Sequence, residues 1–160
     1  MSTRSRIAVL QPDGKVKSVY CHFDGYTDHV GRLLFENYNT EEKANELVAL
    51  GGISVLAVNL YPLAEAPESH FSGLGKPRTI LAEEHSYDNA QDGVTIAYHR
   101  DRKEDFTQAI SENLETFNAG KNFQEYNYLF MDSKWFIRDE KKQWVELTAD
   151  IVENDLPETE

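Results

Sequence analysis

Residues 6–23 carry the pattern that most limits the fold, because they predict two strands joined by a tight turn. Residues 6–11 are a short apolar run rich in β-branched side chains, which favour strands. Pro12, Asp13 and Gly14 suit a turn, since proline presets φ, aspartate bonds its own backbone and glycine accepts positive φ. Residues 15–23 then alternate, so one strand face holds Val16, Ser18, Tyr20 and His22. We therefore expect a β-hairpin.

The elements expected after the hairpin define the fold class. Apolar spacing predicts helices over 27–38 and 40–50, the second capped by Thr40 and ended by Gly51-Gly52. Strands are expected at 53–60 and 94–99, with a long loop over 61–78 between them. A helix is expected over 100–117, followed by a three-stranded meander at 125–131, 134–138 and 143–147. This order predicts an α+β fold with a mainly antiparallel sheet and helices packed on one face.

Length and charge predict one domain over 1–148 and an acidic tail over 149–160. A chain of 160 residues that is 40% hydrophobic is sufficient for a single core. The net charge is −12, and residues 146–160 hold acids but no Lys or Arg. This charge repels phosphates and anionic lipids, so we expect no direct nucleic-acid binding and no membrane association. The alternative is a DNA mimic, whose carboxylates imitate phosphates and inhibit a DNA-binding host enzyme.

The cysteine content and the N-terminus bear on the compartment. Cys21 is the only cysteine, so no internal disulfide forms and the chain suits a reducing environment. Residues 1–6 are polar, and no apolar run approaches the ~18 residues of a membrane span. We expect a cytoplasmic protein.

Residues 20–31 gather the residue types that metal and nucleophile chemistry use. Adjacent strand residues such as Cys21 and His22 point to opposite faces, and the stretch lacks the spacing of a zinc site. Cys21 shares its face with Val19 and Phe23, which indicates a buried and unreactive thiol. We therefore expect no metal, no cofactor and no catalytic cysteine.

Two pairs of arginines that are far apart in the sequence suggest an anion-binding site instead. Arg4 and Arg6 begin the first strand, and Arg100 and Arg102 follow a later one. Arginine forks beside tyrosine rings are what a nucleotide or phosphorylated ligand needs. The competing interpretation is that residues 100–105 are a solvated helix start with weak surface ion pairs.

Three short motifs resemble a known group of proteins. They are Ser2-Thr-Arg-Ser5, Tyr20-Cys-His-x-Asp-Gly-Tyr26 with Val30-Gly31 after it, and Tyr98-x-Arg-Asp-Arg102. Together they resemble short uncharacterised proteins encoded by phages and prophages. Phe23 stands where that motif has tryptophan, and His99 where glycine is common. The group has no assigned reaction, so the resemblance implies a setting, the cytoplasm of an infected bacterium, and not a chemistry.

The resulting hypothesis is a non-catalytic phage accessory protein that acts against host defence. It would bind and neutralise a host defence protein or a nucleotide-derived signal, and a homodimer is compatible with this role. The expected ligand-binding residues are Arg4, Arg6, Tyr20, His22, Asp24, Tyr26, Arg100 and Arg102. The alternatives are a small hydrolase-type enzyme, with His22 as general base and Asp24 as its partner, and the acidic DNA mimic.

Overall fold

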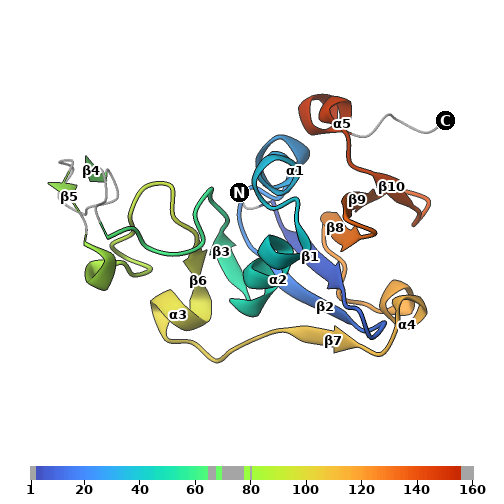
Figure 1. The fold of residues 1–160 in the computed structure, drawn as a ribbon, viewed down its shortest axis with the longest axis horizontal. Coiled ribbons are helices and arrows are strands. Elements are labelled where there is room, and N and C mark those ends of the chain that lie inside the picture. Colours follow the sequence, from blue (N-terminus) through green and yellow to red (C-terminus); the bar gives the residue numbers. More distant parts are fainter. Residues whose placement is uncertain (1–2, 65–67, 70–77, 80, 156–160) are drawn as a thin grey trace.

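The hairpin forms as expected. The computed structural model describes residues 3–64, 68–69, 78–79 and 81–155. In it, β1 (Ser5–Leu10) and β2 (Val16–Cys21) pair antiparallel from Ser5↔Cys21 to Leu10↔Val16. Gly14 in the connecting turn has φ +91°, a conformation that glycine adopts without strain. The hairpin lies at the centre of the molecule (Figure 1).

Among the described residues, six further strands extend the hairpin into a mixed, mostly antiparallel open sheet. They are β3 (Ile53–Val55), β6 (Ile96–Ala97), β7 (Ala109–Ser111), β8 (Tyr126–Met131), β9 (Lys134–Arg138) and β10 (Trp144–Glu146). The order is β10-β9-β8-β1-β2-β3-β6, and β7 also pairs with β2. β1 and β8 are parallel, as are β2 and β3. The predicted α+β class and the β8–β9–β10 meander are both confirmed.

Helices cover one face of this sheet and bury its main core. They are η1 (Thr27–Gly31), a π-helical turn, with α1 (Arg32–Asn37), α2 (Glu41–Ala49) and α5 (Ala149–Asn154). Ile7, Val19 and Cys21 are fully buried beneath them. As predicted, Thr40 caps α2 by accepting a hydrogen bond from the Lys43 amide, an interaction typically worth about 1 kcal/mol.

The opposite face is covered only in part. There α4 (Leu114–Ala119) packs Phe117 against Ala8, Val16 and Leu129. Because Ala8 alternates with the buried Ile7 and Val9 on β1, this second cluster lies on the side of the sheet away from α1 and α2. The part of this face that lies over β2, β3 and β6 carries the candidate site.

The predicted helix over 100–117 is wrong. The structure has a short α3 (Tyr98–Arg102) that ends at Lys103, whose φ of +56° is left-handed. Residues 103–108 then form an irregular strap that leads into β7, and Asn113 caps the separate α4. The apolar spacing misled because Phe106 and Ile110, which appeared to belong to a buried helix face, are 48% and 59% exposed. The predicted strand over 94–99 is likewise shorter, since Tyr98 and His99 begin α3.

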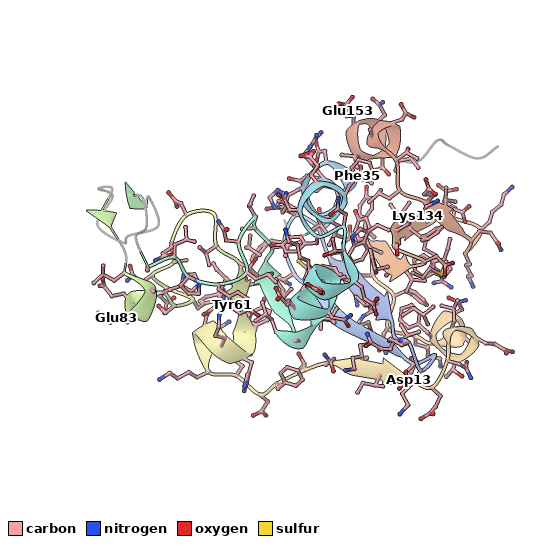
Figure 2. The ribbon with its side chains drawn as sticks, in the orientation of Figure 1. Asp13, Phe35, Tyr61, Glu83, Lys134 and Glu153 are labelled. Atoms are coloured by element: carbon pink, nitrogen blue, oxygen red, sulfur yellow. The ribbon has the colours of Figure 1, made fainter. Side chains whose placement is uncertain are left out.

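The C-terminal segment differs from the expected tail. Residues 149–154 form α5, whose Ile151 and Val152 are buried against the core. The Tyr126 hydroxyl donates to Asp155 Oδ2 at 2.6 Å and ties down its end. Glu153 lies on the outer side of this helix (Figure 2). Residues 156–160 lie outside the described residues, as do residues 65–67 and 70–77 of the predicted 61–78 loop. Within the described residues of that region, β4 (Glu68–Ser69) pairs with β5 (Arg78–Thr79).

Candidate ligand-binding site

Arg6 and Tyr20 form a cross-strand pair on the open face of the sheet. They are direct partners in the β1–β2 register and alternate with buried Ile7 and Val19. Beside them is a cavity of about 350 Å³, lined by Arg6, Val19, Tyr20 and residues 106–109. It exists because β7 pairs with β2 only over residues 16–18 and β3 pairs only at Cys21, which leaves a gap along β2 between them. We call this gap the Arg6 cavity.

The Arg6 guanidinium is held in place yet retains free donors. Nε donates to the Asn122 carbonyl at 2.8 Å, and Nη1 donates to Ser18 Oγ at 2.9 Å. Among the described residues, no protein acceptor bonds Nη2. Burial lowers the pKa of Arg6, but arginine remains charged at neutral pH. A fixed guanidinium with unused N–H groups in a cavity is suited to bind an oxyanion.

Tyr20 and His22 form the aromatic side of the site. The Tyr20 hydroxyl and His22 Nδ1 are 2.6 Å apart, so with the proton on Nε2 the hydroxyl donates to the ring. Burial raises the pKa of Tyr20, while the positive charge of Arg4 opposes this rise. Arg4 is exposed and close enough to Tyr20 for its charge to act on the hydroxyl. The structure thus brings together four of the expected residues, namely Arg4, Arg6, Tyr20 and His22.

Asp24 and Tyr26 pair with each other at the following turn. The Tyr26 hydroxyl donates to Asp24 Oδ1 at 3.2 Å, and the negative charge of Asp24 raises the pKa of Tyr26. Asp24 has φ +56°, which turns the chain into the buried Gly25. Within the described residues neither side chain bonds His22, so the arrangement lacks the carboxylate–histidine hydrogen bond that a general-base pair uses.

Arg100 faces the interior. Its guanidinium donates to the Leu60 carbonyl at 2.6 Å, the Thr95 carbonyl at 2.8 Å and both oxygens of Asp101. Burial alone would raise the pKa of Asp101, but hydrogen bonds from His85, Arg100 and the Ala97 amide outweigh it and lower the pKa to about 2. The hydrogen bonds of Arg100 are therefore part of a structural network. The sequence alone leads us to expect Arg100 at the surface.

Arg102 lies apart from the Arg6 cavity and contacts a residue that sequence reasoning missed. Its guanidinium carbon is 4.4 Å from the centroid of the Tyr87 ring, which stacks on Tyr98. Tyr98 was detectable in the sequence, because strand alternation from the buried Ala97 turns it toward the open face. Tyr87 and the strap residues Phe106, Thr107 and Gln108 had no such signal, since they lie in irregular segments.

The buried thiol of Cys21 agrees with the expectation from strand alternation. It is fully buried, and burial raises its pKa to about 12, so little reactive thiolate forms near neutral pH. In the part of the chain that the structure describes, no group of three or more His, Cys, Asp or Glu residues is placed to hold a metal ion. Over the same residues, no helix has the length and apolar character to cross a membrane.

Comparisons were made with protein-family models, with curated proteins and with solved structures. None of the three found a match to this chain.

Proposed function

We propose that the protein is a non-catalytic phage accessory protein that binds and neutralises a nucleotide-derived signal of its host. The resemblance of the N-terminal motifs to phage-encoded proteins supports the setting. The open sheet face supports the kind of ligand, a small molecule with a phosphate and a planar ring.

The observation that carries this proposal is the Arg6–Tyr20 pair at the wall of the cavity. About 350 Å³ lies within the usual range of small-molecule sites, ~300–1,000 Å³. Arg6 supplies fixed donors for a phosphate, and Tyr20 supplies a ring edge or face for a base. Exposed Arg4 adds positive charge near Tyr20 and favours the approach of an anion.

The contacts favour binding over turnover. His22 Nδ1 is engaged by Tyr20, and Asp24 accepts from Tyr26. The Cys21 thiol is buried and protonated. A hydrolase that used His22 and Asp24 would first have to rearrange both pairs, so we place the enzyme second.

Calorimetric titration with AMP and GMP tests the proposal. We expect at least one to bind the wild-type chain, and Arg6→Gln to weaken that binding about 10- to 100-fold, since a charged hydrogen bond is worth roughly 1.5–3 kcal/mol. Arg32→Gln is the matched control, because Arg32 is a partly exposed helical arginine paired with Glu36. Its affinity should equal that of wild type. Thermal unfolding of each variant checks that the fold is intact; equal affinity in Arg6→Gln contradicts the proposal.

A host defence protein is the second candidate target. Phe106, which lines the cavity, and Ile110 of β7 are both exposed, and aromatic and aliphatic anchors of this kind occur at protein interfaces. Phage growth on a host with active defence, measured with the Arg6→Gln and with the Ile110→Asp variant, separates the two targets. Loss of phage growth with Arg6→Gln alone supports the small ligand, whereas loss of phage growth with Ile110→Asp alone supports the protein target.

A further inference from the structure

A second group of aromatic and basic side chains lies beyond the Arg6 cavity. The rings of Tyr98 and Tyr87 are stacked, with centroids 6.2 Å apart and planes inclined by 28°. The Arg102 guanidinium also lies over the Tyr87 ring, 4.4 Å from its centroid. We call Tyr98, Tyr87 and Arg102 the tyrosine shelf.

Strand register places the shelf on the same sheet face as Tyr20. Ile53 of β3 pairs with Cys21 on one side and with Ala97 on the other, and all three are fully buried. The residues next to Cys21 and Ala97, Tyr20 and Tyr98, therefore face the open side.

Direct contacts agree with this placement. The Tyr98 amide donates to the Gly52 carbonyl at 3.1 Å, and its ring would lie 3.6 Å from a Cβ at Gly52. Burial raises the pKa of Tyr98, and the neighbouring hydroxyls of Tyr87 and Tyr20 raise it further. Tyr98 thus contacts Gly52, next to β3, on one side and Tyr87 on the other.

The shelf is a built feature and not a chance surface pair. The Tyr87 amide donates to the Asp101 carbonyl at 2.8 Å, and the Asp101 side chain is fixed by Arg100 and by His85, whose Nε2 is 3.4 Å away. This buried network joins α3 to the segment that carries Tyr87. A preorganised stack loses little conformational entropy when a further ring is added.

Arg102 can bind a ligand although Glu104 lies beside it. Its Nε lies 3.4 Å from a Glu104 carboxylate oxygen, with the side chains 52% and 48% exposed. Exposed pairs of this kind contribute little stability, so a phosphate can displace the carboxylate. The outer face of the guanidinium plane can also stack on a nucleic-acid base.

We propose that the ligand is two-headed and consists of two linked nucleotide units. This inference rests on the proposed function. One phosphate binds at Arg6 with its base beside Tyr20, and the second base extends the tyrosine shelf with its phosphate at Arg102. From β1 to β6 there are three strand spacings, or ~14 Å. A mononucleotide carries its phosphate next to its base, so it engages one end only.

Calorimetric titration with mononucleotides and linear dinucleotides tests this inference. The probes are AMP, GMP and the 5′-phosphorylated dinucleotides pApA and pGpG. We expect the better dinucleotide to bind at least ten times more tightly than its mononucleotide. Arg102→Ala should reduce this advantage to about twofold or less and leave mononucleotide affinity unchanged. Arg32→Ala, at a partly exposed position on α1, should alter neither value.

The outcomes separate this inference from the function on which it rests. If mononucleotides and dinucleotides bind the wild-type chain equally well, or if Arg102→Ala keeps the dinucleotide advantage, the ligand is not two-headed although the Arg6 cavity still binds. If no probe binds, the proposed function and this inference both fail. Arg102 is exposed, so its substitution is not expected to prevent folding, and thermal unfolding verifies this.

Discussion

Gly25 fixes the turn that positions Tyr20 and His22, because its surroundings leave no room for a side chain. A Cβ there would lie 2.7 Å from the Ser5 Cβ and 2.9 Å from the Thr3 carbonyl oxygen. The backbone is held by the Gly25 amide, which donates to Thr3, and by the Tyr128 hydroxyl, which donates to the Gly25 carbonyl. We expect Gly25→Ala to lower the free energy of unfolding by about 1–3 kcal/mol, measured by urea denaturation.

The double variant Ser5→Gly with Gly25→Ala is the control for this mechanism. Removing the Ser5 side chain eliminates the shortest contact, so the two changes together should cost less than the sum of the single changes. Additive costs would show that the alanine acts through something other than this contact.

At the scale of elements, the Asp101 carboxylate links α3 to the segment that carries His85 and Tyr87. Its folded pKa of about 2 is below the ~3.9 of an unfolded aspartate. The ionised group therefore stabilises the fold above pH ~4, and this contribution is lost as the pH falls toward 2. We expect Asp101→Asn to lose on the order of 2 kcal/mol of stability at pH 7, and the difference from wild type to shrink by pH 2.5. Urea denaturation across this range measures it, and a difference independent of pH would refute the assignment.

The same elements show what the sequence can and cannot predict. The hairpin, the Thr40 cap and the meander follow from local patterns of alternation and capping, and they form as predicted. The structure of residues 100–117 does not follow from local patterns, because it depends on contacts with residues distant in the sequence. Phe106 packs over Gly51, and the Gln108 side chain donates to the Val48 carbonyl at 2.7 Å. The cavity depends on this strap, so the sequence could identify Arg6 and Tyr20 but not the far wall of their site.

At the scale of the whole molecule, the two faces of the sheet have different roles. One face is buried beneath η1, α1, α2 and α5 and supplies the core. The other is only partly covered by α4, and its uncovered part presents arginine and tyrosine side chains. The chain as a whole is acidic, with a net charge of −12, so this positive region differs from the rest of the molecule. This contrast favours binding of a small anion, which contacts only the positive region. A long polyanion would also contact the acidic surface and be repelled by it.

Residues 149–154 of the acidic C-terminal segment form α5 and belong to the folded molecule, which changes how a DNA mimic can be tested. Burial of Ile151 and Val152 stabilises the fold by roughly 1.5–3 kcal/mol each, so a chain that ends at Thr148 should unfold at markedly lower urea concentration. Asp150→Asn with Glu153→Gln removes two exposed charges and leaves the packing unchanged, so we expect wild-type stability and wild-type nucleotide binding. Loss of protection against host defence in this double variant would favour the mimic, whereas full protection supports recognition through the open face.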